Sequence, residues 1–275
     1  MQPVIQTITE TFSFLANQTD LSPSPQINQY FTRLVTSALV PLPEAQVTTI
    51  LAEVESQIGL ARLRELCGTG ETALEVHWAK QLANAPDMLA TLHDFPYYQN
   101  YRHMVQAELA LLRQHAPTAK SVLLVGSGPL PLTAYFLAAE HGMAVECLDI
   151  NPQANQLAQA WLQRLPTPLP ITFTSADVRN LTPMPQADVV WLCALVLGQS
   201  ESEQERLLHT IEARLWPGQF IGIRSVKDLR CLLYPKVNCR CCTNLQFKGV
   251  FHPENEIVNS FVVLQKPPAE PRSAQ

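Results

Sequence analysis

The stretch SVLLVGSGPLPLTA, residues 121–134, decides the fold of this chain. It opens on an apolar run, SVLLV, of the kind that forms a strand buried on both faces of a parallel sheet. Gly126 and Gly128 follow at once, and glycines there permit a tight turn that brings the backbone close to a ligand. A helix-like segment, residues 131–142, comes next. The stretch therefore predicts a strand, a glycine turn and a helix, with a ligand held at the turn.

Strand-like and helix-like segments alternate downstream of this stretch. MAVECLDI, ITFTSAD, ADVVWLCALV and QFIGIRS have the character of strands, whereas NPQANQLAQAWLQRL and SEQERLLHTIEARL have helical periodicity. This alternation predicts an α/β fold with a doubly wound, Rossmann-like parallel sheet. The segment LQFKGVFHPENEIVNSFVVLQK adds two predicted antiparallel strands with a turn near residues 253–255.

The first part of the chain shows helical patterning and no convincing strand. Apolar residues recur near the helical period over residues 43–66, and a second helix is predicted over residues 71–83. The glycines between these two segments are expected to interrupt the helix. The first forty residues predict a loosely organised start with one short helix. We therefore expect two domains, an N-terminal helical domain at 1–117 and a Rossmann-like domain at 118–275.

Composition narrows the function. Charged residues make up 16 % of the chain and the net charge is −5, without a basic stripe, so nucleic-acid binding has little support. No run of about eighteen apolar residues occurs, so no membrane span is expected. The N-terminus lacks the basic start and apolar core of a signal peptide, and we expect a cytoplasmic protein.

The seven cysteines fall mostly within apolar runs, where a reduced cysteine acts as a small hydrophobic residue. The cluster NCRCCTN, residues 238–244, raises the question of a metal site. Its C-x-C-C spacing does not match a four-ligand zinc pattern. We expect a reduced loop here. The alternative is a zinc site built on Cys239, Cys241 and Cys242, which predicts stoichiometric zinc after purification.

Three features in register predict a nucleoside site in the α/β half. The dinucleotide fingerprint would require a third glycine at position 131, where this chain has Pro131, so a pyrophosphate cofactor is disfavoured. Asp149 ends the second strand and suits the two hydroxyls of a ribose. Asp177, after the third strand, is placed to read an adenine amino group. Alternatively, Asp149 starts a helix and Asp177 is a turn residue. Together with the glycine turn, these features predict binding of S-adenosylmethionine.

The helical half adds residues that a plain methyltransferase does not need. Glu71 and Glu75 are four residues apart and share one helix face. They are either a solvated face or carboxylates that take a proton from an attacking amine. The segment DFPYYQNY, residues 94–101, holds three of the six tyrosines of the chain. It forms a packed aromatic cluster, a wall of the site, or both.

Five blocks of sequence together resemble the nicotianamine synthase family. They are LCGTGETALEVHWA, FPYYQNY, VGSGPLPLTA, LDINPQAN and RSVKDLRCLLYP, and they follow in order between residues 66 and 235. The resemblance implies transfer of the 3-amino-3-carboxypropyl group of S-adenosylmethionine to an amine, with methylthioadenosine as the leaving group. The product would be a metal-chelating metallophore.

The resemblance also implies roles for individual residues. Glu71 would be the base, with Glu75 as the alternative, and Tyr97, Tyr98 and Tyr101 would line the cavity. Arg230 and Tyr234 would hold carboxylates of the substrate or product. The remaining predicted residues would hold S-adenosylmethionine: Gly126, Ser127, Gly128, Pro129 and Leu130 at the methionine moiety and ribose, Asp149 and Asn151 at the ribose, Asp177 and Val178 at the adenine, and Ala194 within WLCALV as a wall.

The sequence leaves the amine substrate open. It is either histidine, taking one aminobutyrate unit, or an aminobutyrate derived from S-adenosylmethionine itself. We expect small-molecule substrates only, no metal on the enzyme, and no membrane or nucleic-acid partner; a homodimer is left open. The main alternative is a conventional S-adenosylmethionine-dependent methyltransferase with a helical substrate domain, which would release S-adenosylhomocysteine. A protein that binds the nucleoside without turnover is the second alternative.

Overall fold

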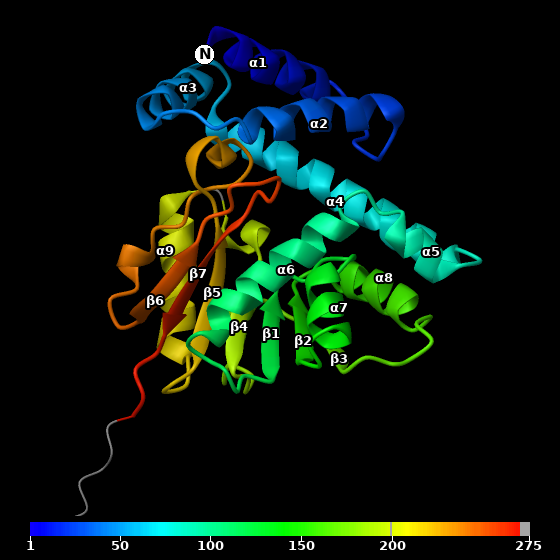
Figure 1. The fold of residues 1–275 in the computed structure, drawn as a ribbon, viewed down its shortest axis with the longest axis vertical. Coiled ribbons are helices and arrows are strands. Elements are labelled where there is room, and N and C mark those ends of the chain that lie inside the picture. The colour runs from blue at the N-terminus through cyan, green and yellow to red at the C-terminus, as the bar shows by residue number, and fades with distance from the viewer. Residues whose placement is uncertain (199, 270–275) are drawn as a thin grey trace, which may run out of the picture.

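A seven-stranded sheet forms the centre of the computed structural model, which describes residues 1–198 and 200–269 (Figure 1). Its strand order is β3-β2-β1-β4-β5-β7-β6, and β7 runs antiparallel to its neighbours. The strands are β1 (Ser121–Val125), β2 (Ala144–Asp149), β3 (Ile171–Ser175), β4 (Val189–Leu192), β5 (Phe220–Ser225), β6 (Gln246–Phe251) and β7 (Ser260–Gln265). The predicted doubly wound sheet and the two antiparallel strands are confirmed.

The strand order reverses direction at β1, which has β2 on one side and β4 on the other. In open α/β sheets such a switch point opens a crevice at the carboxyl ends of the strands, and ligands bind there. The glycine turn after β1 lies at this point. Because β1 and β4 are buried on both faces, they are fixed in place beneath the turn.

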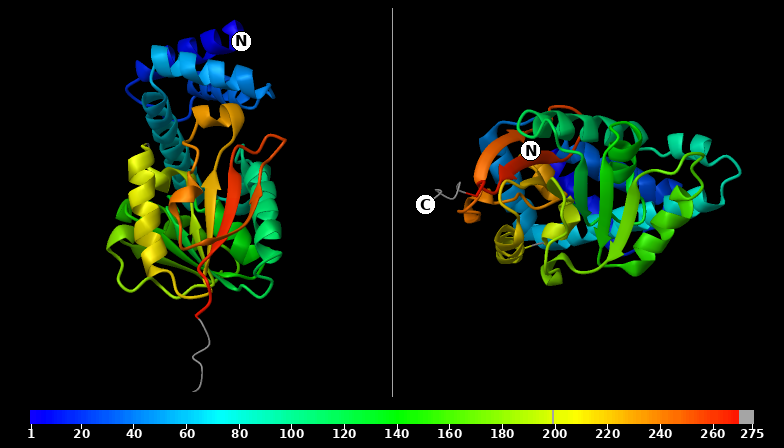
Figure 2. Two further views of the ribbon diagram at one scale, coloured as in Figure 1. Left: turned by 90° about the vertical axis from the view of Figure 1, so that its left-hand side faces the viewer. Right: turned by 90° about the horizontal axis from the view of Figure 1, so that it is seen from below.

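Helices cover both faces of the sheet (Figures 1 and 2). One face carries α6 (Tyr98–Arg113), α7 (Leu132–Ala139) and α8 (Pro152–Leu162), and its core includes Trp161, Trp191 and Phe261. The other face carries α9 (Glu201–Arg214), whose Leu208 and Ile211 pack against strand residues. Four short 3-10 helices complete the connections: η1 (Val178–Asn180), η2 (Ala194–Leu197), η3 (Asp228–Leu232) and η4 (Cys239–Cys241).

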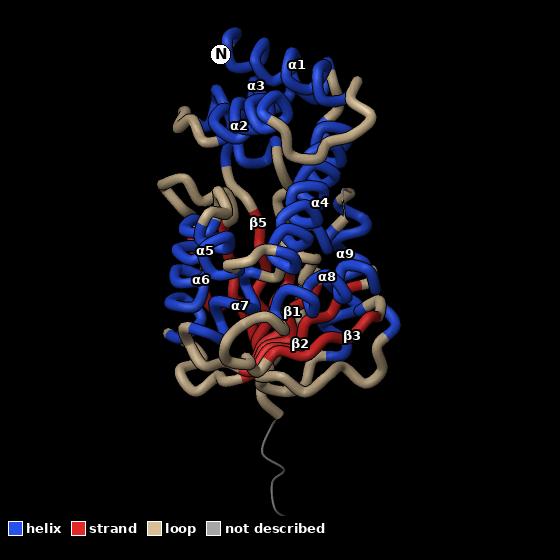
Figure 3. Tube along the Cα trace, turned by 90° about the vertical axis from the view of Figure 1, so that its right-hand side faces the viewer, coloured by secondary structure: helices blue, strands red, loops and turns tan. Residues whose placement is uncertain are grey.

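Three N-terminal helices gather at one end of the molecule, away from the sheet (Figure 3). They are α1 (Gln2–Ala16), α2 (Pro25–Ala38) and α3 (Glu44–Gln57). The prediction of a loosely organised start is wrong. Ile5, Ile8 and Leu15 recur at helical spacing and are buried in cores of their own, and Ser24 caps α2 by accepting a hydrogen bond from the Ile27 amide.

A single long helix, α4 (Leu60–Asn84), joins these helices to the sheet, and the short α5 (Met88–His93) follows it. The prediction that its glycines interrupt the helix is wrong, because α4 continues through Gly68 and Gly70. Packing accounts for Gly70: a Cβ there would lie 2.7 and 2.8 Å from two ring carbons of Phe31 in α2. The glycine is therefore a place of close approach between helices rather than a break.

The helical half is not separate from the sheet. Leu82 of α4, Leu92 of α5 and Leu109 of α6 share one apolar cluster with Val122 of β1. The division into a helical domain at 1–117 and a Rossmann-like domain at 118–275 stays a prediction. Among the helices of the described residues, none is both long and apolar enough to cross a membrane.

Replacement of Gly70 by alanine should lower the free energy of unfolding by about 1–3 kcal/mol, because the added methyl group overpacks against Phe31. Gly68→Ala is the matched control in the same helix, since its Cβ would meet only the flexible end of Leu195, at 3.2 Å. We expect Gly68→Ala to stay within about 1 kcal/mol of the parent protein. Urea unfolding of both variants measures this; equal stability of the two would contradict the close helix contact.

Candidate active site

A cavity of about 750 Å³ lies at the carboxyl edge of the sheet, between the strand ends and α4. This volume is within the range of small-molecule sites. Most of the residues predicted from the sequence line it: Glu71, Glu75, Tyr101, Gly126, Ser127, Gly128, Pro129, Leu130, Asp149, Asn151, Asp177, Val178, Ala194 and Tyr234. Tyr97, Tyr98 and Arg230 are not among the lining residues.

The glycine turn forms the floor of the cavity. Gly126 and Gly128 have φ of +77° and +67°, a conformation that L side chains rarely adopt. A Cβ at Gly128 would lie 2.6 Å from Oε2 of Glu75, so the missing side chain also leaves room for that carboxylate. The amide of Gly128 donates to Oδ2 of Asp149 at 2.9 Å, which fixes the turn against the end of β2.

Asp149 and Asn151 connect the turn to α8. Oδ1 of Asp149 accepts from the Asn151 amide at 2.9 Å, and the Asn151 side chain caps α8 by accepting from Gln153. Each Asp149 oxygen has one hydrogen bond from the protein and keeps further lone pairs directed at other partners. Asp149 therefore has the capacity to accept from two ligand hydroxyls.

Asp177 lines the cavity beside Val178, at the start of η1. Its carboxylate accepts from Arg179 in a two-pronged ion pair, with oxygens 2.7 to 2.9 Å from the guanidinium nitrogens. These hydrogen bonds from Arg179 hold the pKa of Asp177 below its usual value. The carboxylate is thus ionised and held in one orientation by Arg179.

The two glutamates of α4 enter the cavity side by side. Oε2 of Glu71 accepts from the Tyr234 hydroxyl at 2.6 Å. Burial raises the pKa of Glu71, and the Tyr234 hydrogen bond and the charge of Arg224 offset part of that rise. Burial raises the pKa of Glu75 further, and the charges of Glu71 and Asp149 add to it. Because the charge of Glu71 raises the pKa of Glu75, ionisation of both carboxyl groups together is disfavoured.

The surroundings of the two glutamates differ. Glu75 lies over the glycine turn, interacts with Asp149, and has the Tyr101 hydroxyl as a hydrogen-bond partner. Glu71 lies toward Tyr234, whose hydroxyl donates to it. The cavity therefore has one carboxyl on the turn side and one on the Tyr234 side.

Arg224 is the main residue that the sequence predictions missed. It is the penultimate residue of β5, is only 5 % exposed, and lines the cavity. Its Nε and Nη2 donate to the carboxylate of Glu108 in α6 at 2.8 and 2.9 Å, and Nη2 also donates to Thr133 of α7 at 2.8 Å. Glu108 raises the pKa of Arg224 even though burial opposes this. An arginine inside the apolar strand FIGIRS was the available signal.

Arg230 does not fulfil the role predicted for it. Its guanidinium is buried and donates to the carbonyl oxygens of Ile257 and Asn255, at 3.1 and 2.8 Å. It therefore fixes the connection between β6 and β7 rather than facing the cavity. The two arginines are six residues apart, and of the two only Arg224 is among the residues that line the cavity.

The tyrosine cluster divides between cavity and core. Tyr101 lines the cavity, whereas Tyr98 is buried and its ring packs edge-on against Phe136 of α7. The position of Tyr98 gives no support to a catalytic role. Tyr97 packs on Phe95, and burial together with the charge of Glu71 raises its pKa. Tyr97 is not among the residues that line the cavity.

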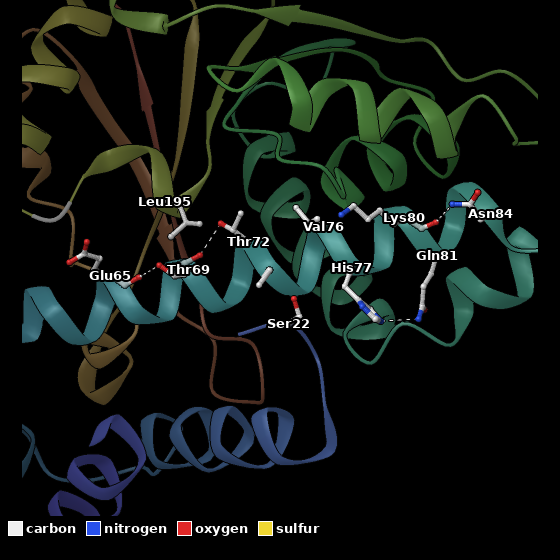
Figure 4. A pocket seen from close by; sticks show the side chains of 12 residues that line it. Ser22, Glu65, Thr69, Thr72, Val76, His77, Lys80, Gln81, Asn84 and Leu195 are labelled. Carbon is white, nitrogen blue, oxygen red and sulfur yellow. Dashed lines mark hydrogen bonds between the residues drawn. The ribbon is translucent and has the colours of Figure 1, made fainter. Parts of the chain in front are cut away.

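A second hollow, a groove of about 890 Å³, runs along α4 (Figure 4). His77 of α4 faces it and pairs with Gln81 at 2.8 Å, and Ser22 from the connection between α1 and α2 lies opposite. Thr72, Val76 and Leu195 line both the groove and the cavity. The groove lacks the buried carboxylates that distinguish the cavity.

The cysteine cluster lies elsewhere in the fold. Cys241 and Cys242 have their sulfurs 3.9 Å apart, and all three cysteines of the cluster are free thiols. Burial raises the pKa of Cys239 to about 11, so that thiol stays neutral near pH 7. Within residues 1–198 and 200–269, no group of three or more His, Cys, Asp or Glu side chains is placed to hold a metal ion.

Comparison with known proteins gives one consistent result. The sequence model of the family described as "Nicotianamine synthase protein" matches residues 1–270. Nicotianamine synthase 3 of Oryza sativa subsp. indica is 34 % identical over 280 residues, covering 98 % of this chain and 80 % of that protein. Nicotianamine synthase of Solanum lycopersicum is 32 % identical over 274 residues, covering 97 % and 84 %.

Solved structures of MtNAS share the fold. A glutamate-to-glutamine variant in complex with S-adenosylmethionine has a TM-score of 0.82 at 21 % identity, covering 96 % of this chain and 98 % of that one. A complex of MtNAS with MTA and tNA also has a TM-score of 0.82 at 21 % identity, covering 96 % and 97 %. The predicted fold, a Rossmann-like sheet preceded by helices, is confirmed.

Glu108→Gln should lower the free energy of unfolding by about 3–5 kcal/mol, because it leaves the charge of Arg224 buried without its partner. Arg102→Gln is the control on the same helix, since its ion pair with Glu140 is partly exposed, with 43 % and 24 % of the side chains accessible. The control should cost less than about 1 kcal/mol. Denaturant unfolding compares the two; a small effect of Glu108→Gln would show that the buried pair contributes little.

Proposed function

Because this chain belongs to the nicotianamine synthase family, we propose that its cavity binds S-adenosylmethionine and transfers the 3-amino-3-carboxypropyl group to an amine. Methylthioadenosine is the leaving group. The observation that carries this reaction is the pair of buried carboxyl groups, Glu71 and Glu75, held by one helix above the glycine turn. The MtNAS complexes with S-adenosylmethionine and with MTA and tNA support the same chemistry.

The cavity suits the nucleoside part of S-adenosylmethionine. The turn residues 126–130 pack against the ribose and the methionine moiety, and Asp149 accepts from the two ribose hydroxyls. Asn151 holds the Asp149 carboxylate in place through its amide. Asp177 and Val178 contact the adenine, and Ala194 forms part of the opposite wall. Adenine and ribose thus lie along the carboxyl edge of β1 to β4, with the sulfonium toward α4.

Glu75 is the carboxylate that pairs with the positive charges of the bound S-adenosylmethionine. That molecule carries a positive sulfonium and a positive α-ammonium group, both of which need negative partners in a cavity with little water. Glu75 lies directly over the glycine turn, where the methionine moiety is placed, and near Asp149. The binding of this cation favours the ionised form of Glu75 and so reverses the effect of burial on its pKa.

Glu71 is the base for the attacking amine. An ammonium ion must lose a proton before its nitrogen can attack, and a carboxylate within hydrogen-bond reach accepts that proton. The Tyr234 hydroxyl, 2.6 Å from Oε2, orients Glu71. The amine nitrogen then forms a bond to the γ-carbon of the methionine moiety, the bond from that carbon to sulfur breaks, and sulfur keeps the electron pair.

The position of the bases decides which carbon reacts. A sulfonium activates all three of its carbons, and the enzyme selects one by where it holds the nucleophile. Glu71 lies on the Tyr234 side of the cavity, beyond Glu75 and the methionine moiety, which favours attack on the aminopropyl chain. Because the sulfonium is already a good leaving group, the reaction needs no metal ion.

The free thiols suit a reducing compartment such as the cytoplasm.

The product of this reaction carries amines and carboxylates, which together bind divalent metals. We propose an amino acid as the amine substrate: either histidine, giving the precursor of an opine-type metallophore, or S-adenosylmethionine itself, giving nicotianamine. Both choices place one carboxylate near the reacting amine. They differ in the number of transfers, which product masses distinguish directly.

The enzyme should release methylthioadenosine when incubated with S-adenosylmethionine, either alone or with L- or D-histidine. Liquid chromatography with mass spectrometry identifies this by-product and the masses of any amine products. Release of S-adenosylhomocysteine instead would show a conventional methyltransferase. Binding of S-adenosylmethionine without any turnover would show a binding protein.

Glu71→Gln should lower the turnover number by at least about 100-fold, because the amine loses its proton acceptor while the shape of the cavity is retained. The dissociation constant for S-adenosylmethionine, measured by calorimetry, should change by less than about threefold. Glu65→Gln is the control, an exposed glutamate on the same helix outside the cavity. Full activity of Glu71→Gln would remove it as the base.

The affinity for S-adenosylmethionine should rise with pH between about pH 5 and 7. Below the raised pKa of Glu75 this group is neutral and does not attract the ammonium, and above it the carboxylate does. The α-ammonium of the substrate stays charged in this range, since α-amino groups titrate near about 7.7–8.0. Calorimetry across this range gives the slope of the logarithm of the affinity against pH. Glu75→Gln should reduce this slope by more than half, and Glu65→Gln should leave it unchanged.

A further inference from the structure

Asn259 presents a hydrogen-bond donor with no partner in the protein. It precedes β7 and lines the cavity. Its amide nitrogen is buried, and nothing among the described residues accepts a hydrogen bond from it. A buried donor left unpaired costs on the order of 1–3 kcal/mol, so such groups usually have a role. A ligand in the cavity is the available partner.

Arg224 has a second unsatisfied donor. Its Nε and Nη2 make three hydrogen bonds, to Glu108 and Thr133. Nη1 carries two N–H groups, and its partner within the described residues is the sulfur of Cys193, 3.9 Å away. Burial raises the pKa of the Cys193 thiol to about 12, so this sulfur is neutral and a weak acceptor. At least one N–H of a fixed guanidinium is thus free for an anion.

The sheet brings these two donors to one face. Arg224 lies directly opposite Phe261, and Ser225 lies opposite Ser260, in the antiparallel pairing of β5 with β7. Asn259 is two residues before Phe261, so it lies on the same face and diagonal to Arg224. Diagonal neighbours are within reach of a long side chain such as arginine.

The connection that carries Asn259 is held from two sides. Arg230 donates to the carbonyl oxygens of Asn255 and Ile257. Asn100, at the start of α6, donates to the carbonyl oxygen of Glu256 at 3.2 Å. The Asn259 amide is therefore positioned before any ligand binds, as an efficient binding group should be.

We propose that Asn259 and Arg224 form a subsite for the α-carboxylate of the amino acid that supplies the attacking amine. This proposal rests on the proposed function, because it requires an amino acid at the Glu71 side of the cavity. Arg224 and Glu71 line the same cavity, and the charge of Arg224 offsets part of the rise that burial causes in the pKa of Glu71. An α-amino acid fits between them, with its amine toward Glu71 and its carboxylate toward Arg224 and Asn259.

The subsite gives the enzyme a way to select amino acids over simple amines. A carboxylate accepts from the Asn259 amide and from Nη1 of Arg224, and it receives a charge-assisted hydrogen bond from the latter. An amine without a carboxylate leaves both donors buried and unpaired. Sites built to hydrogen-bond a substrate group reject analogues that lack it, because their own polar groups are then left unsatisfied.

L-Histidine and histamine are the matched probes, since they differ only in the carboxylate. Methylthioadenosine release is measured with each amine, in the parent protein and in Asn259→Leu, and also with S-adenosylmethionine alone. Asn259→Leu removes the donor at similar volume and leaves Arg224 in place. The parent protein should use L-histidine at least about 100-fold better than histamine in kcat/KM, if histidine is the amine substrate.

Asn259→Leu should raise the KM of the amino acid substrate by about 10-fold or more, and leave kcat/KM for histamine within about threefold. If the parent turns over S-adenosylmethionine alone, the increase appears in the concentration dependence of that turnover. The dissociation constant for S-adenosylmethionine, by calorimetry, should stay within about threefold in either case. Asn255→Leu is the control, because only its backbone carbonyl serves Arg230 and its side chain accepts from Ile257 outside the cavity.

An unchanged KM in Asn259→Leu overturns the subsite while the proposed function stands. Equal loss of activity with L-histidine and histamine also overturns it, since that pattern shows general damage to the cavity. A parent protein that releases no methylthioadenosine with S-adenosylmethionine alone, with L-histidine or with D-histidine overturns the proposed function, and the subsite with it.

Discussion

The ion pair between Arg224 and Glu108 is the interaction on which the site depends. It joins the end of β5 to the middle of α6, two elements 116 residues apart in sequence. Burying two charges costs several kcal/mol each, and paired hydrogen bonds of 2.8 and 2.9 Å offset that cost only in one geometry. Because α6 also carries Tyr101, which lines the cavity, this geometry sets the distance between Tyr101 and the carboxyl edge of the sheet.

The long helix α4 provides the second constraint. It is anchored at one end in the N-terminal helices and at the other against α8, so its middle is held over the glycine turn. Only a continuous helix presents Glu71 and Glu75 one turn apart on the same face. The close approach of Gly70 to Phe31 fixes how closely α4 packs against α2. The two buried glutamates therefore come from the helical half, whereas Asp149, Asp177 and the glycine turn come from the sheet.

Local signals in the sequence predicted much of this arrangement. The glycine turn, Asp149 and Asp177 follow strand ends, and the carboxyl ends of parallel strands meet at one edge, so their grouping could be inferred without coordinates. Arg224 could not be chosen over Arg230 in this way, because its partner Glu108 is distant in sequence. Likewise, helical spacing separates Tyr98 from Tyr101 but does not say which of them faces the cavity. Close helix contact at Gly70 overrode the propensity that predicted a break.

The antiparallel pair β6–β7 adds a connection that contributes to the cavity, apart from the turns that follow the parallel strands. The residues proposed to hold S-adenosylmethionine lie mostly in the turns after β1, β2, β3 and β4, whereas Asn259 lies in the connection between β6 and β7. Under this proposal, the β6–β7 connection serves the amine substrate and does not contact the nucleoside. Replacements between residues 252 and 259 should therefore alter the choice of amine while the nucleoside end of the cavity keeps its lining. The same separation makes this connection the natural segment to exchange in engineering new chelators.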